Sequence, residues 1–146
     1  MLAGSFLASV VLVSCGGGAS RQDTIRAWDA TCRATQARLE AIQVPNVSSK
    51  KDLSRFVTAI GKALPIALNE VDELRAIPVP DEDQQTLDGI LSDLVHSAGQ
   101  LRAAQRAAKK GDLAKTKAAL SKSATDTRKA GAAAKAYGMQ VCGQSS

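Results

Sequence analysis

The sequence predicts an all-α protein built as an up-down-up-down four-helix bundle. Three observations predict this fold class. Apolar residues recur at alternating steps of three and four in four long segments, which is the period of an amphipathic helix with one buried face. No segment alternates apolar and polar residues with the period of two that is typical of strands, so we expect no sheet. The connections between the four segments are short, which favours antiparallel neighbours.

The first helix is predicted by a stripe of residues that would share one buried face. The stripe comprises Ile25, Trp28, Cys32, Thr35, Leu39 and Ile42. Pro45 ends this helix, because its ring restricts the preceding residue and it has no N–H to donate. Ser48 and Ser49 follow, and since Ser is a favoured N-cap residue, we expect them to cap the second helix.

The second helix carries the most regular stripe. Its members are Leu53, Val57, Ile60, Leu64, Ala67, Val71 and Leu74. Pro65 lies inside this helix, where its missing N–H and the crowding of the Gly61 carbonyl predict a kink rather than a break. Pro78 and Pro80 end the helix.

The third and fourth helices are predicted by two further stripes, of which the last is looser. The stripes comprise Leu87, Leu91, Leu94, Ala98, Leu101, Gln105 and Ala108, then Leu113, Thr116, Leu120, Ala124, Thr127, Gly131 and Ala134. The acidic run at 81–83 would fill the first turn of the third helix, where the helix dipole favours carboxylates. Gly111 would end that helix, Asp112 would cap the fourth, and Gly138 would end it.

The N-terminus carries the most specific motif of the chain. An uncharged apolar segment at residues 2–13 leads into Leu12-Val13-Ser14-Cys15, and three glycines follow. About a dozen apolar residues are too few for a transmembrane helix, which needs roughly 20, and fit the apolar part of a signal peptide. This order resembles the lipobox of bacterial lipoproteins. The chain as a whole resembles small helical lipoproteins of high-GC Gram-positive bacteria.

The resemblance implies that residues 1–14 are a signal peptide and that Cys15 is the lipidated first residue of the mature protein. Acyl chains on Cys15 would anchor the protein in the cell membrane on its extracytoplasmic side. Residues 15–21 would then be a flexible tether, 22–143 the bundle, and 144–146 a disordered tail. The alternatives are an ordinary secretory signal and an intracellular protein with an apolar N-terminal arm.

Export also bears on the two other cysteines. In an oxidising compartment Cys32 and Cys142 are expected to form one disulfide. The bundle topology would bring them together, because the end of the fourth helix lies beside the start of the first, with Trp28 and Tyr137 flanking the bridge. Two free or metal-binding thiols are the alternative.

Charge is distributed unevenly along the chain. Residues 16–100 contain 9 Lys and Arg against 12 Asp and Glu, whereas residues 101–146 contain 10 against 2. A basic end is predicted where the turn between the third and fourth helices meets the connection between the first and second, opposite the tether and the acidic run. It comprises Lys50, Lys51, Arg106, Lys109, Lys110, Lys115 and Lys117. Such a patch attracts anions over roughly 8 Å at physiological salt.

Two binding functions follow as hypotheses. The first is a non-enzymatic binding or scaffolding module whose basic end takes an anionic partner, such as a wall polymer or an acidic protein. Nucleic acid is not expected, because no aromatic residues alternate with these charges for base stacking. The second is a carrier that holds an apolar small molecule or lipid in the bundle core. A set of small residues could leave a cavity there, although close packing of the helices is the more common result. These small residues are Gly89, Gly99, Ala104, Gly131 and Ala134.

The sequence offers no enzymatic constellation and no cofactor motif. His96 is the only histidine, and it lies beside the apolar stripe, so we interpret it as a solvated helix residue. Glu70, Asp72 and Glu73 lack the Glu-x-x-His pairs of carboxylate-bridged metal bundles and are interpreted as a solvated face. We therefore expect a monomeric protein without metal, cofactor or catalytic activity.

Overall fold

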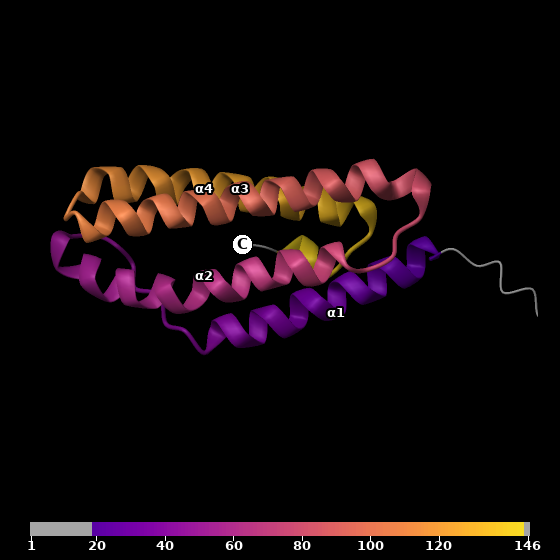
Figure 1. Cartoon of the computed structure of the whole chain (residues 1–146), viewed down its shortest axis with the longest axis horizontal. Coiled ribbons are helices and arrows are strands. Elements are labelled where there is room, and N and C mark those ends of the chain that lie inside the picture. The colour runs from indigo at the N-terminus through magenta and orange to yellow at the C-terminus, as the bar shows by residue number, and fades with distance from the viewer. Residues whose placement is uncertain (1–18, 145–146) are drawn as a thin grey trace, which may run out of the picture.

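The computed structural model describes residues 19–144 and forms four long helices, α1 (Arg21–Glu40), α2 (Leu53–Arg75), α3 (Gln84–Lys109) and α4 (Leu113–Tyr137). Three short 3₁₀ turns, η1 (Lys50–Asp52), η2 (Asp81–Asp83) and η3 (Cys142–Gln144), complete the fold. The helices run up and down along one long axis, as Figure 1 shows. Residues 19–144 contain no strand. The predicted up-down-up-down four-helix bundle is thus confirmed, whereas the segment predicted to be a signal peptide, Cys15 and the last two residues lie outside the described part.

The helix ends follow the predicted caps, with two refinements. Asp112 accepts the backbone N–H of Lys115 at 2.9 Å and caps α4, and Gly138 ends α4 with a φ of 115°. Ser48 and Ser49 do not cap α2 directly, because both of their hydroxyls donate to the Asp52 carboxylate and η1 comes first. These contacts, led by the backbone N–H of Ser49, hold the pKa of Asp52 well below its usual range. The acidic run likewise forms η2, just ahead of α3.

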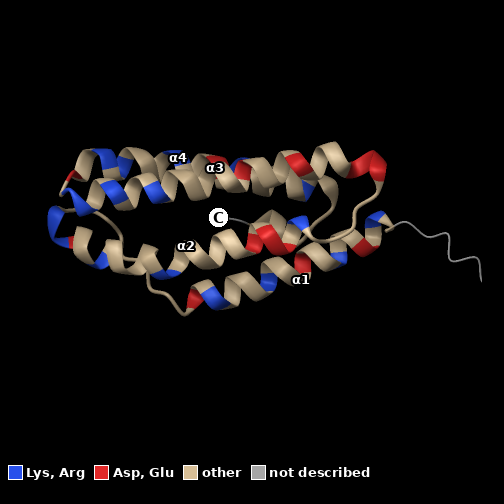
Figure 2. Cartoon of the chain, viewed as in Figure 1, with Lys and Arg blue, Asp and Glu red and all other residues tan. Residues whose placement is uncertain are grey.

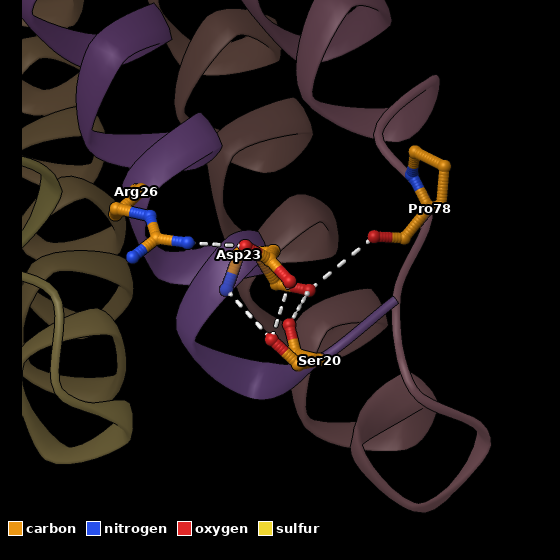
Figure 3. Close-up of polar contacts among 5 residues, drawn as sticks. Ser20, Asp23, Arg26 and Pro78 are labelled. Atoms are coloured by element: carbon orange, nitrogen blue, oxygen red, sulfur yellow. Dashed lines mark hydrogen bonds and ion pairs between the residues drawn. The ribbon is translucent and has the colours of Figure 1, made fainter. Parts of the chain in front are cut away.

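The start of α1 is fixed to the connection between α2 and α3. Ser20 caps the helix by accepting the backbone N–H of Asp23 at 3.2 Å, and Arg26 pairs with the Asp23 carboxylate. The hydroxyl of Thr24 is buried and donates to the carbonyl of Pro78 at 3.3 Å. Figure 3 shows this group of contacts. These contacts fix the N-terminal end of α1 at Ser20.

Pro65 lies inside a helix that continues through it. The axis of α2 changes direction part of the way along its length (Figure 1), as expected where a helix loses the N–H that would bond four residues back. On the face toward α3, the Gln105 side chain donates to the carbonyl of Val57 at 3.1 Å. A polar residue in the stripe of α3 thus meets the backbone of α2 two turns before Pro65.

The four helices do not pack equally closely. The tightest pair is the α3–α4 hairpin, α2 lies on α3, and α1 lies on α2, whereas α1 has few close contacts with α4. Between α1 and α4 lies the C-terminal turn η3, which contacts both (Figure 1). The bundle is therefore closed on its fourth side by a turn rather than by direct helix packing.

A disulfide and one carboxylate hold that turn in place. Cys32 of α1 is bonded to Cys142 of η3, with 5.4 Å between their Cα atoms. The buried carboxylate of Asp29, one turn earlier on α1, accepts the backbone N–H groups of residues 140, 141 and 142 at 2.8–3.0 Å. The expected disulfide is thus present, and Trp28 and Tyr137 belong to the same buried cluster.

Candidate functional site

A cavity of about 370 Å³ lies among the helices. All four helices and η3 contribute to its wall. Most of the wall is aliphatic or small, and its charged member is Glu70. The residues from α1 and α2 are Trp28, Cys32, Thr35, Gln36, Leu39, Ala67, Glu70, Val71 and Leu74; those from α3, α4 and η3 are Ile90, Leu94, Ser97, Ala98, Leu101, Thr127, Ala130, Gly131, Ala134, Cys142 and Gln144.

The cavity has a structural cause. The buried apolar residues form two separate clusters, one around the disulfide and one around Phe56 at the other end. At the level of the cavity, Ala67, Ala98 and Gly131 present little side-chain volume. Because η3 rather than a close α1–α4 contact fills the fourth side of the bundle, this level is incompletely packed.

Only some of the small residues that sequence reasoning singled out belong to this space. Gly131 and Ala134 line the cavity. Ala104 is buried in the cluster around Phe56, and Gly89 and Gly99 are exposed. Ala104 is thus closely packed, whereas Gly131 and Ala134 of α4 border open space.

Glu70 is the polar residue of the cavity wall whose environment differs most from the one predicted from the sequence. Asp72 and Glu73 are exposed, as expected for a solvated face, but Glu70 is half-buried and lines the cavity. Burial raises the pKa of Glu70 to about 7, with the positive charge of Arg38 opposing the rise and Glu73 adding to it. The interpretation of all three carboxylates as solvated is therefore wrong for Glu70.

Within the part of the chain that the structure describes, Glu70 has no counter-ion of its own. The nearby Arg38 of α1 makes its ion pair with Glu73, at 3.3 Å between Nη2 and Oε2. Among the described residues, the Glu70 carboxyl takes part in no hydrogen bond and no ion pair. A half-buried carboxyl beside an apolar space is therefore left without a partner.

Trp28 adds a donor to the same wall. Its side chain is 1% exposed, and its indole N–H has no hydrogen-bond partner within residues 19–144. The hydroxyls of the wall are paired, since Ser97 lies 2.8 Å from the Thr127 oxygen and 2.9 Å from that of Ser123. The wall thus contains one carboxyl and one indole that the atoms of residues 19–144 leave without a hydrogen-bond partner.

The predicted basic end is assembled at the opposite end of the bundle from η2. Figure 2 shows Lys and Arg gathered where the α3–α4 turn meets η1, and Asp and Glu at η2. All seven predicted cations are exposed. Two of them are engaged locally: Lys115 pairs with Asp112 at 3.1 Å, and Lys117 donates to the carbonyl of Ser48 at 3.2 Å. The structure thus brings together residues from η1, α3 and α4 that are distant in the sequence.

The other candidate residues lie neither in the cavity nor at the basic end. His96 is exposed on α3. Within the described range, no group of three or more His, Cys, Asp or Glu side chains is arranged to hold a metal ion. The helices of residues 19–144 include none that is long and apolar enough to cross a membrane. Cys15 lies outside the described residues.

Comparison of the chain with protein-family models, with curated proteins and with solved structures found no match.

The pH dependence of stability tests the environment of Glu70. The folded protein holds the Glu70 proton up to about pH 7, whereas an unfolded glutamate releases it near 4.5. The free energy of unfolding therefore decreases as the pH rises between these values. Because glutamine mimics the protonated acid, Glu70→Gln should unfold like the parent at pH 4 and be about 1–3 kcal/mol more stable at pH 8.

Urea unfolding at both pH values, followed by circular dichroism, measures the difference. Asp72→Asn is the control, because Asp72 is an exposed carboxylate on the same helix, and its stability relative to the parent should not follow this pattern. Stability curves of Glu70→Gln and the parent that run parallel from pH 4 to 8 would contradict the assignment.

Proposed function

We propose that this protein is a lipid-anchored, extracytoplasmic binding protein that holds an apolar small molecule in the cavity of its helical bundle. The observation that carries the proposal is the cavity itself, whose 370 Å³ falls in the range of about 300–1,000 Å³ typical of ligand sites. Its apolar wall with a few polar groups has the composition of such sites. The role is non-enzymatic.

Filling the cavity with a ligand would also be energetically favourable. A space of this size leaves the surrounding side chains without partner atoms on one side, and a ligand restores those contacts. An apolar cavity of about 150 Å³ is sufficient to bind benzene. The cavity described above therefore has room for a ligand considerably larger than a single aromatic ring.

The proposed anchor rests on the lipobox at Leu12-Val13-Ser14-Cys15. Two or more acyl chains on Cys15 would hold the protein stably on a membrane. Residues 16–20 would then separate the lipid from the cap of α1 at Ser20. In this arrangement the end of the bundle with η2 lies near the membrane, and the basic end points away from it.

Native mass spectrometry of the protein purified from its membrane tests the cavity. We expect a bound mass that is lost in Ala67→Phe, because the ring would occupy the space beside Glu70. Overpacking costs typically 1–3 kcal/mol, so circular dichroism should first show that the helices persist. Ala118→Phe, on an exposed position of α4, is the matched control and should retain the ligand. A parent protein that is free of bound mass would argue strongly against the carrier role.

Metabolic labelling tests the anchor. The protein should incorporate labelled palmitate and sediment with membranes, and Cys15→Ser should abolish both properties, because serine cannot form the thioether that holds the lipid. Ser14→Ala, which keeps a small residue before Cys15, should label normally. Membrane association that survives Cys15→Ser without label would defeat the lipoprotein assignment.

The basic end supports a second candidate function, the binding of an anionic polymer or acidic protein. Its support is the convergence of seven exposed cations from three elements. Binding of poly-L-glutamate, measured by fluorescence anisotropy, should weaken as salt is raised, because exposed charges are screened. Reversal of Lys109, Lys110, Lys115 and Lys117 to Glu should abolish it.

The matched control for this experiment changes the net charge equally at the other end of the bundle. It is a quadruple reversal of the exposed residues Arg33, Arg75, Arg128 and Lys135 to Glu. If both quadruple variants lose binding to the same extent, net charge rather than the basic end governs the interaction.

A further inference from the structure

We propose that the ligand of the bundle cavity is an amphiphilic amine whose ammonium group pairs with the carboxylate of Glu70 while its apolar body fills the space between the helices. This inference rests on the carrier function proposed above. It goes further by naming the polar group of the ligand and the residue that binds it.

The first argument is the missing partner of Glu70. A buried or half-buried carboxylate is costly unless it is paired, and its natural complement is a cation that also donates hydrogen bonds. Within residues 19–144 the Glu70 carboxyl has no such partner, although it lines the cavity. A ligand cation would supply the interaction that the protein omits.

The second argument is the balance of charge around Glu70. From α1 the facing charged group is Arg38, and from α2 itself it is Glu73. The wall residues from α3, α4 and η3 are all uncharged. Because Arg38 is paired with Glu73, ionised Glu70 leaves the site with one uncompensated negative charge. An ammonium ion neutralises that charge, whereas an anionic head group would add a third negative charge beside a single guanidinium.

The third argument is size. In a liquid, each water-sized atom occupies about 30 Å³. The cavity volume of 370 Å³ therefore holds about a dozen non-hydrogen atoms. A straight-chain amine of about ten carbons fits that volume. The aliphatic residues Leu39, Val71, Ile90 and Leu94 would contact the chain.

The ion pair between the ammonium group and Glu70 makes the affinity for the amine depend on pH. An alkylamine stays protonated below about pH 10, so only Glu70 titrates in the working range. The amine requires the ionised carboxylate, and burial places the pKa of Glu70 at about 7. Affinity for the amine should therefore rise on going from pH 5.5 to pH 8, by about ten- to thirtyfold.

The test uses three probes that share a ten-carbon chain, namely decylamine, decanol and decanoate, with the purified full-length protein and isothermal titration calorimetry. At pH 8 decylamine should bind about tenfold or more tightly than decanol, and decanoate most weakly. Glu70→Gln should bind decylamine no more tightly than decanol and should lose the pH dependence, yet retain decanol. Asp72→Asn should behave like the parent.

The outcomes separate this inference from the carrier function. Decanol binding as tight as that of decylamine, with parent and Glu70→Gln alike at both pH values, would overturn the amine assignment and leave the carrier function standing. Decanoate as the tightest probe would also overturn it. If none of the three probes binds, both proposals fail.

Discussion

The structure depends on the bond between α1 and the C-terminal turn. Helix α1 packs on α2, and its first turn contacts the α2–α3 connection through Thr24. Its covalent link to the rest of the bundle runs through η3, where the Cys32–Cys142 disulfide is supported by the three backbone N–H groups that Asp29 accepts. The two cysteines are 110 residues apart. In the chain-entropy treatment, closing so long a loop stabilises a fold by up to about 4–5 kcal/mol. For a small bundle with few aromatic residues, that is a large share of its total stability.

The same bond explains the cavity. A helical bundle normally closes by direct packing of its first and last helices at 8–10 Å. Here a turn of three residues is placed between α1 and α4, so the two helices stay further apart along part of their length. The apolar residues around the disulfide and those around Phe56 fill the two ends, and the level of Ala67 and Gly131 between them stays open. The covalent link that holds η3 between the two helices thus goes together with an open level in the core.

The fold could be predicted from the sequence because its determinants are local. Apolar periodicity, Gly138, Asp112 and the prolines place the helices, and the antiparallel topology brings Cys32 to Cys142. The position and size of the cavity could not be predicted, because they depend on the distance between helix axes, which no spacing of residues encodes. Glu70 was within reach: it lies three residues after Ala67 and four before Leu74, beside the apolar stripe of α2. Because Glu70 was interpreted together with the exposed residues Asp72 and Glu73, its place beside the buried face was not recognised.

The loop that the disulfide closes also determines what happens to a damaged molecule. Residues 33–141 lie inside this covalent ring, and the ring includes the exposed connection between α1 and η1. A protease that cuts anywhere within it produces two fragments that remain joined through Cys32 and Cys142. In the lipid-anchored arrangement proposed above, a single cleavage would therefore nick the chain without releasing either half.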